Sequence, residues 1–236
     1  MQIDSIKDLI NEIDLTVGSK MYRGQSNSEW SLIPSIARMH EALDDHGFGF
    51  SKWEDLEDYL LNHFKNYSAP FMDFNPSLDL EWLVHAQHHG LPTPLLDWST
   101  NPLKALFFAV ENPSEDKTDG ALYEIQPRMW HITYESIENH HGLVAFHPKQ
   151  INSRVMAQEG CFTRFPYPDK LVPLPSLEEK DTFISNEIYT IKKYFIPKEI
   201  KANLRVELTK LGIHHQSMFP SLDGASTRIR REFNLA

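Results

Sequence analysis

The fold is decided by residues 85–109, which read HAQHHGLPTPLLDWSTNPLKALFFA. The helical pattern that enters this stretch ends at Gly90, because glycine favours a helix C-cap, and Pro92 and Pro94 cannot continue a helix. Polar side chains that can take part in binding or catalysis therefore lie between two apolar segments. We expect the function of the protein to reside in this stretch.

A short strand and a second helix follow that break. Residues 93–98 read as a buried strand, and Ser99 or Asn101 can cap a helix that begins near Pro102. Apolar side chains recur at helical spacing in this helix, which predicts a buried face: Leu103, Leu106, Phe107 and Val110. The polar cluster is thus held between two rigid elements.

Composition limits the class of protein. The chain has 236 residues, of which 41% are hydrophobic, enough to fill a sizeable core. A formal net charge of −10 argues against nonspecific nucleic-acid binding, which needs clustered Lys and Arg. A single cysteine, Cys161, cannot form an internal disulfide. The sequence shows neither a signal peptide nor an apolar run of membrane-spanning length, so we expect a soluble, cytoplasmic protein.

The remaining patterns predict an α+β protein. Helices are expected over 5–14, 53–69, 77–89, 197–211 and from 221 onwards, and strands over 21–25, 120–125 and 187–196. Residues 154–165 read as a strand pair bent at Gly160, and residues 126–148 read as irregular. No internal repeat or low-complexity linker appears, so one domain over 1–236 is favoured over two.

The sequence gives little support for a metal site or for a Ser-His-Asp triad. His85 could share a metal ion with His88 or His89 on one helix face, but no glutamate or cysteine cluster accompanies them, so we expect hydrogen-bonding histidines and no metal. Ser99 lacks the Gly-x-Ser-x-Gly turn of a hydrolase, and Asp97 is too near it in sequence to complete a triad. Cys161 reads as a small strand residue.

Arg23 precedes Gly24 at the end of a predicted strand, and two interpretations remain open. The pair can be a surface arginine beside a turn glycine. Alternatively, Gly24 allows a ligand to approach the backbone while Arg23 presents a planar fork to phosphate or carboxylate.

Four blocks of the sequence closely resemble the FRG domain, named for its Phe/Tyr-Arg-Gly motif. They are YRGQ at 22–25, WSLIP at 30–34, AQHHGLPT at 86–93 with LLDW at 95–98 and ALFFA at 105–109, and AQEGCF at 157–162. The resemblance extends to residues 219–224 and thus covers nearly the whole chain.

A more distant resemblance, to ADP-ribosyltransferases of the arginine-serine-glutamate type, bears on mechanism. Arg23-Gly24, Ser99-Thr100 and Gln158-Glu159 occur in the order of the three motifs of those enzymes. The resemblance implies a small split sheet, mixed or antiparallel, flanked by helices. It further implies that Arg23 holds the phosphates of NAD, with Gly24, Gln25 and Thr100 beside it, and that Ser99 supports the nicotinamide ribose.

The third motif would supply the catalytic side chain. Gln158 and Glu159 are adjacent on a predicted strand and point to opposite faces, so only one can enter the cleft. Asp97 and His88 are the other candidates for catalysis.

Two functions follow from the resemblances. In the first, the cleft binds NAD and transfers ADP-ribose to a macromolecule, as a bacterial toxin or phage-defence effector would. In the second, the same cleft recognises a nucleotide or a partner without chemistry. Neither hypothesis includes a metal or a membrane.

Overall fold

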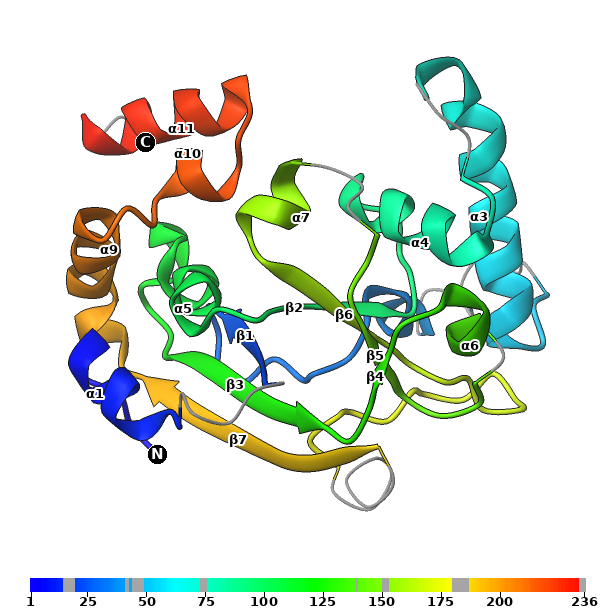
Figure 1. Ribbon diagram of the computed structural model, residues 1–236, viewed down its shortest axis with the longest axis horizontal. Coiled ribbons are helices and arrows are strands. Elements are labelled where there is room, and N and C mark those ends of the chain that lie inside the picture. The colour runs from blue at the N-terminus through cyan, green and yellow to red at the C-terminus, as the bar shows by residue number, and fades with distance from the viewer. Residues whose placement is uncertain are drawn as a thin grey trace.

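The computed structural model describes residues 1–14, 20–40, 43, 49–72, 76–138, 140–149, 153–179 and 187–233. Its centre is a curled, seven-stranded sheet in the order β4-β5-β6-β2-β1-β3-β7 (Figure 1). The strands are β1 (Met21–Gln25), β2 (Leu95–Ser99), β3 (Gly120–Pro127), β4 (Trp130–His131), β5 (Val144–Phe146), β6 (Gly160–Arg164) and β7 (Ile188–Ile196). The expected mixed sheet is confirmed, since β4 and β5 are parallel and the other neighbours are antiparallel.

The sheet is larger than expected and is split only partly. Strand β1 pairs with β3 through five residues and β2 pairs with β6 through five, whereas Tyr22 and Ser99 are the only registered pair between β1 and β2. We call this junction the seam. The two halves of the sheet therefore remain one sheet but diverge beyond a single point of contact.

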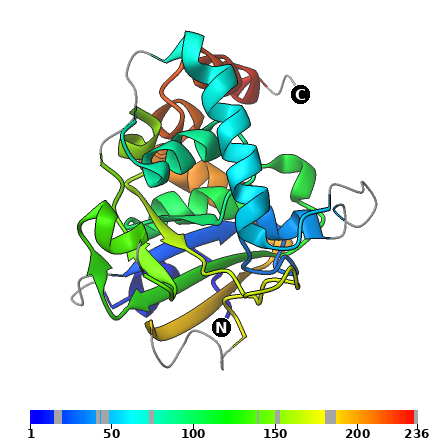
Figure 2. The same cartoon turned by 90° about the vertical axis from the view of Figure 1, so that its right-hand side faces the viewer.

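Helices flank both halves of the sheet (Figures 1 and 2). The α-helices are α1 (Ile6–Glu12), α3 (Trp53–Ser68), α4 (Asp79–His88), α5 (Pro102–Val110), α6 (Tyr134–Glu138), α7 (Ser153–Ala157), α9 (Lys201–Lys210), α10 (His215–Met218) and α11 (Leu222–Glu232). Short 3₁₀ turns are η1 (Ser35–Met39), η2 (Ala69–Phe71), η3 (Pro113–Glu115) and η4 (Lys198–Ile200).

Each half of the sheet has its own helical cover. Apolar side chains of α1, α5 and α9 pack with those of β1, β3 and β7 in one cluster. Side chains of α3, α4 and α6 pack with those of β2, β5 and β6 in another. A third cluster contains residues of both halves, including Met21, Trp98 and Tyr123. Burial on both sides of the seam thus fixes the two halves relative to each other.

The local signals in residues 85–109 are confirmed. Helix α4 ends beside Gly90, whose φ of +86° is one that glycine adopts readily. The side chain of Asn101 accepts hydrogen bonds from the amides of Leu103 and Lys104, so Asn101 caps α5. Ser99 is instead the last residue of β2.

Two segments differ from the expectation. Residues 126–148, expected to be irregular, contain β4, α6 and β5, because strands of two or three residues are too short to show periodicity. Residues 154–157 belong to helix α7 and not to a strand, and Glu159 turns the chain into β6 with a φ of +48°. Gln158 and Glu159 therefore lie in a turn, and the expected alternation of strand faces does not apply to them.

Gly24 is required by packing of the backbone. A Cβ at this position would lie 2.6 Å from the backbone nitrogen of Ala109 and closer still to the carbonyl oxygen of Ala105. Both atoms belong to α5, so the glycine lets the helix lie directly on β1. Gly24 also lines the cavity described below.

We predict that Gly24→Ala lowers the free energy of unfolding by about 3 kcal/mol, because the added methyl meets backbone that cannot move aside. Gly160→Ala is the matched control and should destabilise the protein less, since its Cβ would lie 3.3 Å from both the side chain and the backbone oxygen of Val155. Urea denaturation of the two variants checks this. Equal stability of Gly24→Ala and the wild type would show that α5 does not rest on β1 as described.

Candidate functional site

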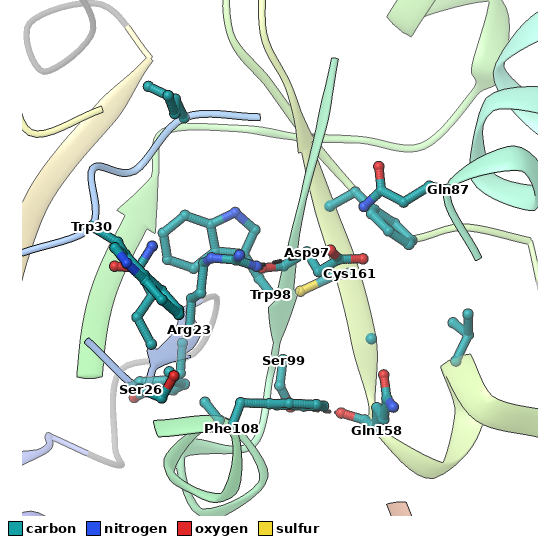
Figure 3. Close-up of a pocket in the computed structure, with 18 of the residues that line it drawn as sticks. Arg23, Ser26, Trp30, Gln87, Asp97, Trp98, Ser99, Phe108, Gln158 and Cys161 are labelled. Carbon is teal, nitrogen blue, oxygen red and sulfur yellow. Dashed lines mark hydrogen bonds and ion pairs between the residues drawn. The ribbon is translucent and has the colours of Figure 1, made fainter. Parts of the chain in front are cut away.

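A cavity of about 820 Å³ opens where β1 and β2 diverge (Figure 3). Its walls come from β1 and the loop after it, η1, α4, β2, α5, α7 and β6. Of the predicted site residues, those in the wall are Arg23, Gly24, Gln25, His88, Asp97, Ser99 and Gln158. Thr100 and Glu159 do not line it.

Arg23 crosses the seam from β1 to β2. Its Nη1 donates a hydrogen bond of 2.7 Å to the backbone oxygen of Asp97, and the Oδ2 of Asp97 lies 3.8 Å from the same nitrogen. Burial lowers the pKa of the guanidinium, Asp97 opposes this effect, and Arg38 reinforces it by repulsion. Arg23 nevertheless remains cationic, because an arginine is deprotonated only at extreme pH.

Two polar atoms on β1 are buried and unpaired within the described residues. They are the Nε of Arg23 and the Oε1 of Gln25, whose side chains lie on the same face of β1 and line the cavity. Buried polar groups usually have partners, and an unpaired one costs about 1–3 kcal/mol. A ligand with both acceptor and donor groups would satisfy these two atoms.

The cavity has more cations than acids. Arg23, Arg38 and Arg154 line it, against Glu29 and Asp97. Among the residues that the structure describes, no hydrogen bond or ion pair engages the guanidinium of Arg38 or of Arg154. Because the whole chain carries a net charge of −10, this concentration of arginines is a local feature that favours an anionic ligand.

His88 contributes a neutral imidazole. Burial, together with repulsion from the nearby Arg154, His89 and His85, lowers its pKa to about 4, and Asp97 opposes this effect. At neutral pH the ring can therefore both donate and accept a hydrogen bond. His85, one helical turn earlier, is buried, and the described residues include no group of three or more side chains suited to a metal.

Aromatic surfaces accompany the arginines. The side chain of Trp30 is 48% exposed at the cavity, and Phe108 is partly buried against the cluster around α5. Trp98 is buried and donates from Nε1 to the hydroxyl of Thr163 at 3.0 Å. Trp30 and Arg23 both line the cavity (Figure 3), so a ligand with a flat ring and charged groups can contact both side chains.

Ser99 and Gln158 brace the cavity wall. The Ser99 hydroxyl donates to the backbone oxygen of Gln158 at 2.7 Å and accepts from the amide of Asn101 at 3.0 Å. The Gln158 side chain donates from Nε2 to the backbone oxygen of Met218 at 3.1 Å. These bonds connect β2 to the turn before β6 and that turn to α10.

Glu159 is engaged outside the cavity. Its carboxylate pairs with Lys104 at 2.8 Å and accepts from the side-chain amide of Asn101 at 3.3 Å. Its backbone oxygen accepts from the amide of Thr100 at 3.0 Å and from the Thr100 hydroxyl at 3.4 Å. Glu159 and Thr100 therefore bind each other and neither lines the cavity, which leaves Asp97 as the predicted carboxylate in the cavity wall.

The lining residues that were not among the predicted site residues include Trp30, Arg38 and Arg154. Trp30 lies in the WSLIP block that resembles the FRG domain, and Arg38 follows this block closely. Their positions in the sequence therefore indicate that both belong near the site. Arg154 was assigned to a strand, and only the recognition of α7 places its side chain in the wall. Cys161 lines the cavity as well, and burial raises the pKa of its thiol, so it is not a reactive thiolate.

Comparison with known proteins gives one match. The model of the FRG domain family matches residues 18–118, which include β1, η1, α4, β2 and α5. No curated protein and no solved structure matches the chain. Within the described part of the chain, no helix has the length and apolar character needed to cross a membrane. The matched segment supplies Arg23, Asp97 and most of the other cavity residues, so most of the cavity wall comes from the part of the chain that matches the FRG domain family.

Proposed function

We propose that the cavity binds a nucleotide that carries a diphosphate, with NAD as the ligand that the transferase resemblance suggests. The observation that carries this proposal is the pair of buried, unpaired atoms on β1, Arg23 Nε and Gln25 Oε1, in a wall that also contains Arg38. A phosphate oxygen can accept from Arg23, and a ribose hydroxyl or carboxamide can donate to Gln25.

Size and shape support the same ligand class. Pockets for small molecules and cofactors commonly measure about 300–1,000 Å³, and the cavity of about 820 Å³ is near the upper end of that range. Trp30 and Phe108 offer stacking surfaces for the two rings of a dinucleotide. The negative net charge of the chain repels anions in general, so affinity must come from the arginines in the wall.

Calorimetric titration with NAD tests the proposal. We expect binding by the wild type and a loss of affinity of about ten- to a hundredfold in Arg38→Gln, because a charge-assisted hydrogen bond contributes about 1.5–3 kcal/mol. Arg23→Lys should lose at least as much, since lysine keeps the charge but lacks the fork and the Nε donor.

Arg128→Gln is the matched control, because Arg128 lies outside the cavity, over the ring of Tyr189. Urea denaturation of each variant shows that it folds. Absence of binding heat and of thermal stabilisation by NAD in the wild type would contradict the proposal.

Transfer of ADP-ribose is a second candidate, favoured by the position of Asp97. Its side chain is 61% exposed, lines the cavity and lies beside Arg23. In such a reaction the bond between the ribose C1′ and the nicotinamide nitrogen breaks, and neutral nicotinamide leaves with the electron pair. An acceptor nucleophile bonds to C1′ and gives its proton to Asp97, whose negative charge also stabilises the cationic sugar.

Release of nicotinamide from NAD separates this reaction from binding alone. We expect Asp97→Asn to lower kcat by at least about 100-fold while NAD affinity changes little, because general base catalysis acts in the transition state. Glu159→Gln is the control and should retain turnover, since Glu159 does not line the cavity and its carboxylate pairs with Lys104. Loss of turnover in Glu159→Gln alone would contradict the role of Asp97, and a wild type that binds NAD without releasing nicotinamide would be a binding module.

A further inference from the structure

Arg154 lies in a part of the cavity wall that the FRG match does not cover. The match ends at residue 118, whereas Arg154 belongs to α7. Its guanidinium carbon is 4.8 Å from the ring centre of Phe219, just beyond α10. The side chain is therefore held in place by a cation–π contact with the C-terminal part of the chain.

The neighbours of Arg154 do not neutralise it. Burial lowers the pKa of the guanidinium and Asp97 raises it, but no hydrogen bond or ion pair joins Arg154 to another described residue. His88 faces the same region as a neutral ring at pH 7, and Gln158 contributes a neutral amide. This end of the cavity thus retains a positive charge that no described side chain pairs with.

Asp97 interacts with this charge and with the one on β1. It affects both Arg23 and Arg154 electrostatically, and it lies beside Arg23 in Figure 3. Arg23 and Arg38 come from β1 and η1, whereas Arg154 comes from α7, and all three line the same cavity. A single ligand that fills the cavity would meet these arginines and the carboxylate of Asp97.

We infer that Arg154 forms a second anionic subsite, which takes a phosphate monoester on the same dinucleotide whose diphosphate meets Arg23 and Arg38. This inference rests on the proposed nucleotide function and names its substrate class as a dinucleotide phosphorylated on a ribose hydroxyl, as NADP is. An arginine next to the ribose accommodates a 2′-phosphate in other dinucleotide sites. Arg154 lies outside the segment that matches the family. A protein that resembles this chain only over residues 18–118 would therefore lack the subsite.

Parallel titrations with NADP and NAD test the subsite. We expect the wild type to bind NADP at least about tenfold more tightly than NAD, and Arg154→Gln to bind the two equally, because it loses more affinity for NADP than for NAD. Arg128→Gln is the matched control, because like Arg154→Gln it removes one positive charge and one cation–π contact. It should preserve the preference for NADP over NAD. Folding of both variants is checked by urea denaturation.

The outcomes separate this inference from the proposed function. Equal affinity of the wild type for NAD and NADP, or an equal loss for both ligands in Arg154→Gln, would overturn the subsite while dinucleotide binding stands. A further titration with NAD is made in the presence of millimolar inorganic phosphate. If phosphate raises the affinity for NAD in the wild type but not in Arg154→Gln, and NADP binds no more tightly than NAD, Arg154 binds a separate phosphate ion and the inference is wrong. Binding of neither dinucleotide would overturn the proposed function and the subsite together.

Discussion

The hydrogen bond from Arg23 to the backbone of Asp97 joins the two halves of the sheet where backbone pairing ends. The sheet changes direction at this seam, so one side chain replaces the ladder of hydrogen bonds that a regular strand pair would form. The same contact brings a partly buried cation and an exposed carboxylate to one point. The cavity is thus a consequence of how the sheet is joined.

Contacts on both sides of the seam hold β1 and β2 in place. On one side, Gly24 allows α5 to lie against β1, and buried Lys201 donates to the backbone oxygen of Ser26 at 2.6 Å and of Glu115 at 2.8 Å. On the other side, Ser99 and Gln158 tie β2 to the turn before β6. Because these supports are hydrogen bonds and close backbone contacts, the cavity wall is held in one arrangement before any ligand enters. Preorganisation of this kind reduces the entropy lost on binding.

The sequence predicted the fold best where local rules act. The cap at Asn101, the glycine after α4 and the strand β7 each depend on neighbours within a few residues, and the structure agrees with them. The short strands β4 and β5 and the helix α7 could not be found in this way, because tertiary pairing and packing define them. The role of Gly24 was also hidden, since the sequence could not show α5 lying across β1.

The candidate site was predicted in part for the same reason. Arg23, Asp97 and Ser99, which motif resemblance selected, line one cavity because they belong to adjacent strands. It could not decide the orientation of Glu159, which depends on one positive φ and on a pair with Lys104. Arg154 was missed because its position depends on a helix that sequence periodicity did not reveal.

A crystal structure of the protein with NAD tests the central claim most directly, namely that the charge and the unpaired atoms at the seam form a nucleotide site. The account predicts a diphosphate oxygen within about 3.2 Å of the Nε of Arg23, with Arg38 beside it and a ring against Trp30. Clear density for NAD elsewhere on the molecule, or an empty cavity at saturating NAD, would contradict it.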